Sequence, residues 1–169
     1  MDPRKIYKFC PICGKEMIEK PDHPQCSSCG FVFYINSAPT SDAIIENDKQ
    51  QILLVKRKND PKKGYWDLPG GFIESGEDLH TSVKRELREE LAVDIDVKDV
   101  VGFYPGVYVF QNVEYPILNI IVAAKIVGGN PTPADDIAGY AFFDKDKVLQ
   151  QELAFPGTRR ALEDYFALN

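Results

Sequence analysis

Three glutamates in one short segment, Glu86, Glu89 and Glu90, have the side chains and the spacing for metal chemistry. On a helix, residues three and four apart share a face, so the three carboxylates would lie within an arc of about 100°. Such like charges destabilise a helix by about 0.2–0.5 kcal/mol per pair, and a bound divalent cation would remove that cost. Carboxylate oxygens suit Mg²⁺ or Mn²⁺ better than zinc. A solvated, salt-bridged helix surface is the alternative, since basic residues are interleaved with the glutamates.

A second candidate site lies near the start of the chain, where Cys10, Cys13, Cys26 and Cys29 form two C-x2-C pairs twelve residues apart. This spacing is typical of a tetrahedral thiolate site, and zinc is the metal it favours. A segment of about 30 residues cannot bury enough apolar surface to fold alone, so the metal would supply the missing stability. Two disulfides, or a single iron, are the alternatives. His23 lies between the pairs, but four thiolates already complete the coordination of the metal, so His23 is not expected to be a ligand.

The glutamates need a helix to position them, and the sequence predicts one from about Glu77 to Leu91 with Ser75 as its N-cap. An apolar residue recurs at every fourth position and gives the helix one buried stripe, formed by Leu79, Val83, Leu87 and Leu91. A C-terminal helix is expected to start after Thr158.

Strand-like segments separated by turn residues surround these helices, at residues 43–45, 51–55, 97–103, 106–110, 115–127 and 140–143. The first two are expected to pair as a hairpin through the polar turn 47–49. An apolar run at residues 31–35 is expected to be a strand that leads out of the cysteine segment. The pattern predicts a small N-terminal metal unit followed by one α/β domain.

The composition of the chain argues against several classes of protein. The 169 residues are 44% hydrophobic and 27% charged, which excludes a wholly disordered chain. No apolar run is long enough for a membrane helix and the first residues do not resemble a signal peptide, so we expect a cytoplasmic protein without a membrane partner. A net charge of −6 argues against general binding to nucleic acid, although the lysines of the cysteine segment leave such contact open.

Residues 71–93 read GFIESGEDLHTSVKRELREELAV. This stretch resembles the Nudix box, G-x5-E-x7-R-E-U-x-E-E-x-G-U, in which U is a bulky aliphatic residue. The matching positions are Gly71, Glu77, Arg85, Glu86, Leu87, Glu89, Glu90 and Val93. The one departure is Ala92, which stands where the family usually has glycine, and it puts the geometry of the helix end in question. The preceding WDLPG of residues 66–70 is also typical of the family.

The resemblance implies an α/β/α sandwich with a mixed sheet over residues 36–169, preceded by a zinc ribbon over residues 1–35. The implied activity is metal-dependent hydrolysis of a nucleoside diphosphate linked to another moiety. By family analogy, Mg²⁺ or Mn²⁺ is held by the box glutamates and the carbonyl of Gly70. The implied roles fall on Glu86, Glu89 and Glu90 as ligands and on Glu77 paired with Arg85 to orient them.

Other residues are candidates for the remaining roles. Asp135 or Asp136 could supply a general base or an extra ligand, because family members differ in where the base lies; an exposed acidic turn is the alternative. Residues 56–63 carry five basic side chains and one acidic side chain, so we expect Arg57 or Lys58 to contact a phosphate. Tyr108 lies where dinucleoside polyphosphate hydrolases of the family often carry a tyrosine.

The substrate is less defined than the chemistry. A zinc ribbon before a Nudix domain resembles NADH pyrophosphatases, but this chain lacks their S-Q-P-W-P-F-P-x-S motif. ADP-ribose, NADH and dinucleoside polyphosphates therefore all stay open as substrates. A Nudix-like module that senses nucleotides or binds nucleic acid, with weak or no catalysis, is the alternative function. Whether the chain forms a homodimer also stays open.

Overall fold

A computed structural model describes residues 1–168, which divide into two compact units. The first unit contains residues 1–37 together with 107–116, and the second contains residues 38–106 and the chain from 117 onward. None of the helices within residues 1–168 has the length and apolar character needed to cross a membrane.

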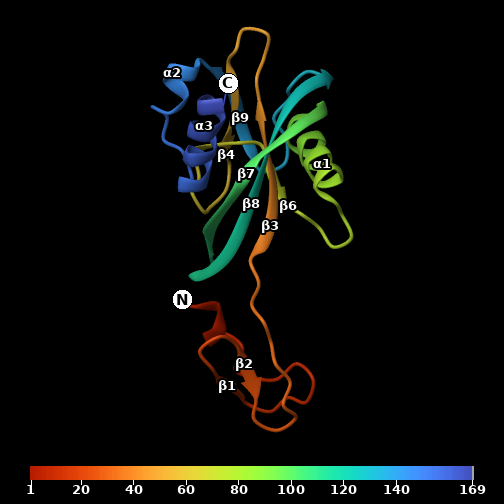
Figure 1. Cartoon of the computed structure of the whole chain (residues 1–169), viewed down its shortest axis with the longest axis vertical. Helices are drawn as coiled ribbons and strands as arrows, with labels where there is room; N and C mark the ends of the chain where they lie inside the picture. Colours follow the sequence, from red (N-terminus) through yellow and green to blue (C-terminus); the bar gives the residue numbers. More distant parts are fainter. Residues whose placement is uncertain (169) are drawn as a thin grey trace. The chain divides into compact units, whose positions relative to one another are not determined.

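Two sheets form the centre of the second unit (Figure 1). The first sheet has the order β6-β3-β8-β7, with bounds Gly70–Phe72, Ala38–Ile45, Val113–Gly128 and Asp94–Phe110. The second has the order β5-β4-β9, with bounds Trp66–Asp67, Ile52–Arg57 and Ile137–Phe143. Strand β3 runs parallel to β8 and antiparallel to β6, so the first sheet is mixed, as predicted.

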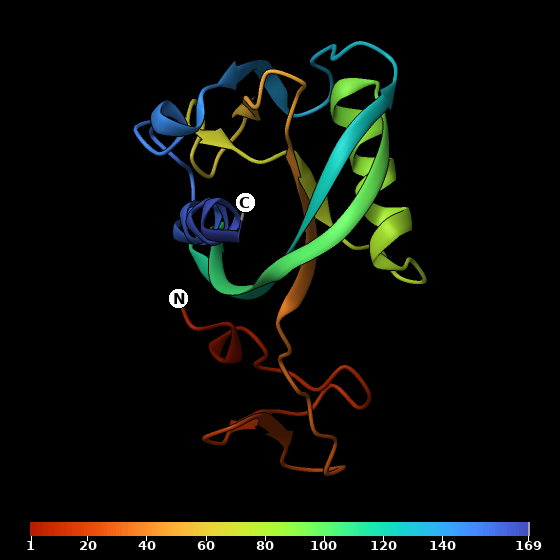
Figure 2. The same cartoon turned by 45° about the horizontal axis from the view of Figure 1, so that its top comes forward.

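Helices cover opposite faces of this centre: α1 (Leu79–Leu91) on one side, α2 (Lys145–Val148) and α3 (Pro156–Leu168) on the other (Figures 1 and 2). Neighbouring side chains of a strand point to opposite faces, so the side chains of β3 can pack against helices on both sides of the sheet. Ala43 and Ile45 pack in the cluster that contains Leu87 of α1, whereas Ile44 packs in the cluster that contains Leu162 of α3. The predicted α/β/α sandwich is confirmed.

Helix α1 begins two residues later than expected. Asp78, not Ser75, is its N-cap, and the Asp78 carboxylate accepts the N–H of Thr81 at 2.8 Å. The predicted Ser75 cap is therefore wrong, and Glu77 lies outside the helix. At the other end, Ala92 adopts the left-handed conformation with φ 56°, the conformation for which glycine is preferred.

The apolar stripe of α1 is buried as predicted. Val83, Leu87 and Leu91 have no exposed surface, and Leu79 packs against the same cluster from the edge. The stripe fixes the rotation of the helix, and hence the direction in which its glutamates point.

The hairpin predicted for residues 43–45 and 51–55 is wrong. Strands β3 and β4 share a single bridge, between Glu46 and Ile52, and then diverge into different sheets. Strand β8 pairs along one edge of β3 and β6 pairs with residues 40–42 on the other, whereas β4 pairs with β5 and β9. The turn between β3 and β4 was identified correctly, but the sequence did not show which partners each strand would find.

Two predicted strands, 97–103 and 106–110, are one continuous strand, β7. It connects to β8 through Gln111 and Asn112, which both have positive φ, as a two-residue turn of the type found in tight hairpins requires. The last helix starts at Pro156, two residues before Thr158, since proline is well suited to the first helical position.

The first unit contains a short 3₁₀ turn, Pro3–Lys5, and two short strands, β1 (Met17–Glu19) and β2 (Pro24–Cys26). The strand predicted at residues 31–35 is absent apart from one bridge, between Gln25 and Val32. Within this unit the N-terminal ammonium donates to the carbonyl of Asn112 at 2.7 Å. That contact ties the start of the chain to segment 107–116.

Candidate functional site

Strand β6, which precedes α1, lies against strand β3. Gly70 pairs with Asp42 in the β3–β6 register and has φ 141°. A Cβ on Gly70 would lie 2.2 Å from the carbonyl oxygen of Ser41, so only glycine permits this approach. A Cβ on Gly71 would instead lie 2.6 Å from a carboxylate oxygen of Glu86. The two glycines therefore leave space, respectively, for the backbone of β3 and for a glutamate of α1.

Arg85 is the centre of the charged cluster on α1. Its guanidinium donates to both carboxylate oxygens of Glu77, at 2.8 and 2.9 Å. It also donates to Glu86 at 2.8 Å and to Glu89 at 3.0 Å, and to the carbonyl of Phe72 at 3.1 Å. The structure thus shows the Glu77–Arg85 pair that the family pattern implies, and the same guanidinium contacts two of the three box glutamates.

Glu90 differs from the other two glutamates because it is buried, with 4% of its surface exposed. Its carboxylate accepts the N–H of Gly70 at 2.9 Å. Burial raises the pKa of Glu90 well above its usual range, and the nearby charge of Asp136 raises it further. Half of the Glu89 side chain is exposed. The helix therefore presents one buried and one exposed carboxylate side by side.

Glu86 lies between these extremes. Burial is the main cause that raises the pKa of Glu86, the Arg85 hydrogen bond opposes the shift, and the charges of Glu89 and Asp136 add to it. Anionic carboxylates that repel one another in a partly dry site favour a cation. Of the two downstream aspartates, the structure brings the Asp136 carboxylate into the field of the box glutamates, whereas Asp135 is held through its backbone carbonyl.

Two further acidic residues near this site were not singled out by the sequence. Asp42 accepts the hydroxyl of Thr40 at 2.9 Å, and Asp67 accepts the hydroxyl of Thr158 at 2.7 Å and the N–H of Leu68 at 3.0 Å. Burial raises the pKa of Asp67 to about 6 and raises that of Asp42 well above its usual range. A charged residue directly before the apolar run at residues 43–45 was the available signal for Asp42.

Both predicted phosphate contacts are engaged within the chain. Arg57 donates to the carbonyl of Pro61 at 2.9 Å, lies 3.5 Å from Asp67 and stacks over the ring of Phe155. Lys58 donates from its ammonium to the carbonyl of Asp135 at 2.9 Å. Arg57 therefore fastens the loop that follows β4, and only Lys58 keeps an exposed hydrogen bond that a ligand could replace.

The cysteines form a compact cluster in the first unit. Within residues 1–168, they are the only group of possible metal ligands whose ligand atoms all lie within 4.8 Å of one another. Sulfur atoms from the two pairs approach to 3.5 Å, between Cys13 and Cys26 and between Cys13 and Cys29. Backbone N–H groups point at the sulfurs of Cys10 and Cys26, at 3.4 Å. Such donors favour thiolates, so the donor set fits a tetrahedral zinc.

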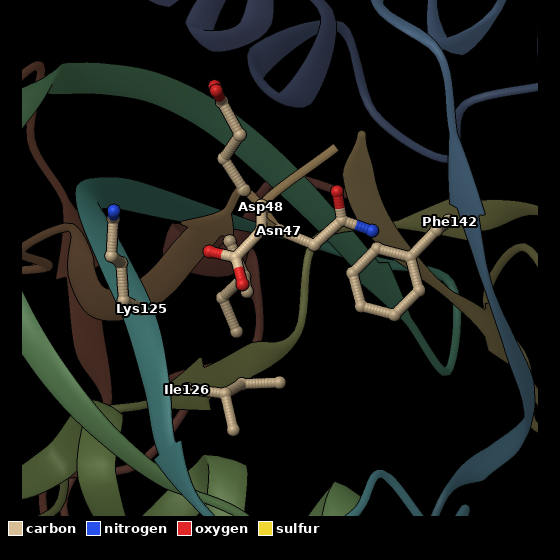
Figure 3. A pocket seen from close by; sticks show the side chains of 7 residues that line it. Asn47, Asp48, Lys125, Ile126 and Phe142 are labelled. Carbon is tan, nitrogen blue, oxygen red and sulfur yellow. The ribbon is translucent and has the colours of Figure 1, made fainter. Parts of the chain in front are cut away.

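Two hollows of the second unit lie away from these residues. One, with a volume of about 160 Å³, opens beside the β3–β4 turn, where Asn47 and Asp48 face Lys125 and Phe142 (Figure 3). The other, of about 420 Å³, lies beside Val101 and Tyr165. Neither hollow is lined by a predicted site residue, so neither enlarges the candidate site.

Comparison with known proteins identifies the family to which this chain belongs. A family model described as the NUDIX domain matches residues 37–165. The ADP-ribose pyrophosphatase of Methanocaldococcus jannaschii is 34% identical over 152 residues, which cover 90% of this chain and 83% of that protein. The NAD-capped RNA hydrolase NudC of Pseudomonas aeruginosa is 29% identical over 133 residues, which cover 76% of this chain but 44% of that protein. The shared part is thus less than half of NudC.

Solved structures agree with this match. A NUDIX hydrolase from Nitrosomonas europaea has a TM-score of 0.75 at 26% identity and covers 95% of this chain, with 90% of its own chain aligned. The NUDIX domain of Shewanella oneidensis NrtR, solved in complex with ADP ribose, has a TM-score of 0.63 at 25% identity. The aligned parts are 79% of this chain and 90% of that one.

Proposed function

Since this chain belongs to the Nudix family and is a pyrophosphohydrolase of nucleoside diphosphate derivatives, we propose that ADP-ribose is its preferred substrate. The observation that carries the proposal is the match, over 90% of the chain, to a relative described as an ADP-ribose pyrophosphatase. NADH is the second candidate among these derivatives, supported by the NudC match, but the motif of NADH pyrophosphatases is missing from this sequence.

The proposed catalytic site is the charged cluster of α1. Glu86, Glu89 and Glu90, with the carbonyl of Gly70, would hold Mg²⁺ or Mn²⁺, and this set of hard oxygen donors with excess negative charge fits such a cation. When bound, the metal would neutralise the diphosphate and lower the pKa of a coordinated water. Arg85 and Glu77 orient the ligands, because the guanidinium contacts Glu86 and Glu89 directly.

The chain's own groups must also take up the proton of the attacking water. A carboxylate whose pKa is raised above its usual range is suited to this task, since it accepts a proton more readily than an exposed carboxylate. Glu90 and Asp136 are the candidates, because they lie together and Glu90 is shielded from water. We assign the base to this pair, because the charge of Asp136 acts on the buried Glu90 carboxylate.

The cysteine cluster is proposed to bind one structural Zn²⁺. We propose residues 1–35 as a zinc ribbon and residues 36–169 as the hydrolase domain. The lysines near the cysteines offset the negative charge of a zinc tetrathiolate, which supports this assignment.

The test is a substrate panel. Purified protein with Mg²⁺ or Mn²⁺ is incubated with ADP-ribose, NADH, diadenosine polyphosphates and NAD-capped RNA, and the products are separated by chromatography. We expect the highest kcat/KM for ADP-ribose. Tight nucleotide or RNA binding without turnover of any substrate would instead indicate a sensing module.

Variants test the assigned residues. Glu89→Gln and Glu90→Gln are expected to lower kcat by roughly 100-fold or more while the fold is preserved, because each removes a charge that the cation needs. Glu163→Gln, an exposed position of α3, is the matched control and should retain wild-type turnover. Wild-type rates in both box variants would refute the ligand assignment.

A further inference from the structure

The segment 129–136 is fastened to the end of the helix that carries the glutamates. The N–H of Thr132 donates to the carbonyl of Leu91, and the N–H of Ala134 donates to the carbonyl of Glu90, both at 2.8 Å. Carbonyls in the last turn of a helix have no partner within the helix, so this segment supplies partners that water would otherwise provide. Its path is thus fixed relative to the backbone of α1.

The other end of the segment is fastened by a turn hydrogen bond, from the N–H of Ile137 to the carbonyl of Ala134 at 3.0 Å, and by Lys58. The backbone N–H of Lys58 donates to the carbonyl of Asp136 at 2.8 Å, and the Lys58 ammonium donates to the carbonyl of Asp135 at 2.9 Å. These bonds lie one step beyond the β4–β9 ladder, whose last pair is Arg57 with Ile137. Lys58 therefore holds two consecutive carbonyls just before β9 begins.

The residue held in this way interacts electrostatically with the proposed site. Asp136 is close enough to Glu86 and Glu90 for its charge to act on both carboxylates. The preceding residue, Asp135, has φ 48°, a conformation that residues other than glycine seldom adopt without support. The turn bond from Ile137 to Ala134 gives part of that support, and the ammonium of Lys58 adds to it at the Asp135 carbonyl, so releasing the ammonium would loosen the peptide between the aspartates.

We propose that Lys58 is a positioning residue that fixes the Asp136 carboxylate beside Glu86 and Glu90 by holding the carbonyl of Asp135. The inference rests on the proposed function, since it assumes that Asp136 acts with the box glutamates. The sequence led us to expect that Lys58 contacts a phosphate of the substrate. The proposal instead gives Lys58 a positioning role within the protein.

The experiment is a double-mutant cycle of Lys58→Met with Asp136→Asn. Methionine keeps the length of the side chain and removes the ammonium, and the backbone bond of residue 58 is unaffected. We measure kcat and KM for ADP-ribose with Mn²⁺, and separately the affinity for Mn²⁺ by electron paramagnetic resonance without substrate. Lys63→Met, at an exposed lysine of the same loop, is the matched control.

We expect Lys58→Met to lower kcat and Mn²⁺ affinity about tenfold, within the range for residues that orient metal ligands, and Lys58→Arg to restore most of both. In the Asp136→Asn background, Lys58→Met should change neither quantity, because the carboxylate it positions is gone. The Lys63→Met variant should match the wild type throughout.

Three results would overturn the proposal. The first is an equal loss of kcat and Mn²⁺ affinity on Lys58→Met in the wild-type and Asp136→Asn backgrounds. The second is a raised KM with unchanged kcat and Mn²⁺ affinity, as expected of a phosphate contact. The third is Lys58→Met behaving like Lys63→Met. Failure of the proposed function is separate: the wild type would not turn over ADP-ribose, while the Mn²⁺ titrations would still decide the role of Lys58.

Discussion

Arg85 and Glu77 meet through two parallel hydrogen bonds, Nε to Oε1 at 2.8 Å and Nη2 to Oε2 at 2.9 Å. Glu77 lies before the first residue of α1 and Arg85 in its second turn, so the pair ties the loop to the helix. The Arg85 hydrogen bonds lower the pKa of Glu77 to about 2, so this carboxylate is charged throughout the neutral range. The same guanidinium has donors left for Glu86 and Glu89.

Replacement of this arginine by lysine should be costly although the charge is kept. An ammonium cannot make the forked contact to Glu77 and also reach Glu86 and Glu89. We expect Arg85→Lys to lower kcat/KM by roughly 10–100-fold, the usual range for residues that orient metal ligands. Steady-state kinetics measure this, with Arg88→Lys as control because Arg88 is exposed and pairs with Asp94. Equal activity of the two variants would contradict the orienting role.

Alanine at the two adjacent glycines should have different effects. In Gly70→Ala the new Cβ would collide with the backbone of Ser41, which cannot move without disturbing β3. In Gly71→Ala it would meet the end of the Glu86 side chain, which can rotate away. We therefore expect a large loss of thermal stability for Gly70→Ala, and a loss of turnover with little change in Tm for Gly71→Ala. Calorimetry and kinetics on both proteins would reveal a reversed pattern, which would contradict this geometry.

Glycine at position 92 should stabilise the protein. Ala92 ends α1 in the left-handed conformation, where a Cβ is unfavourable, and its side chain is exposed, so no packing is lost on replacement. We expect Ala92→Gly to raise the free energy of unfolding by about 0.5–1 kcal/mol. Urea denaturation measures it. Ala138→Gly, at an exposed position of β9, should lower stability instead, and stabilisation by both substitutions would rule out the conformational explanation.

Asp67 should make stability depend on pH. Because burial raises its pKa from 3.8 to about 6, the folded state binds the proton more tightly than the unfolded state. The contribution of Asp67 is therefore most favourable below its unfolded pKa and is lost as pH rises through about 6. The shift corresponds to at most about 3 kcal/mol.

The comparison with Asp67→Asn isolates this effect. The stability of the wild type relative to Asp67→Asn should fall between about pH 4 and about pH 8, because asparagine has no charge to bury. Denaturation across this range measures the difference. A constant difference would show that Asp67 has the same pKa in the folded and unfolded states.

Zinc should be retained by the purified protein. Elemental analysis is expected to find about one zinc per chain, because four thiolates complete a tetrahedral site. Cys10→Ser and Cys26→Ser, at the two buried cysteines, should lose the metal, and far-ultraviolet circular dichroism should then show loss of structure in the first unit. Folded protein without zinc would remove this assignment.

Local patterns in the sequence predicted the structural features that depend only on residues close together in the chain. The spacing of Val83, Leu87 and Leu91 predicted the buried face of α1, since the helical repeat places them together without reference to the rest of the fold. The spacing of the cysteines likewise predicted their cluster. The family resemblance then supplied the sandwich and the chemistry.

The tertiary structure decided what depends on residues far apart in the chain. Strand partners that no local pattern specifies decide the separation of β3 and β4 into two sheets, the burial of Asp67, and the contacts of Lys58 with the carbonyls before β9. Sequence periodicity records which face of an element is apolar. The packing of the layers decides which element covers that face. It therefore also decides which carboxylates are shielded from water.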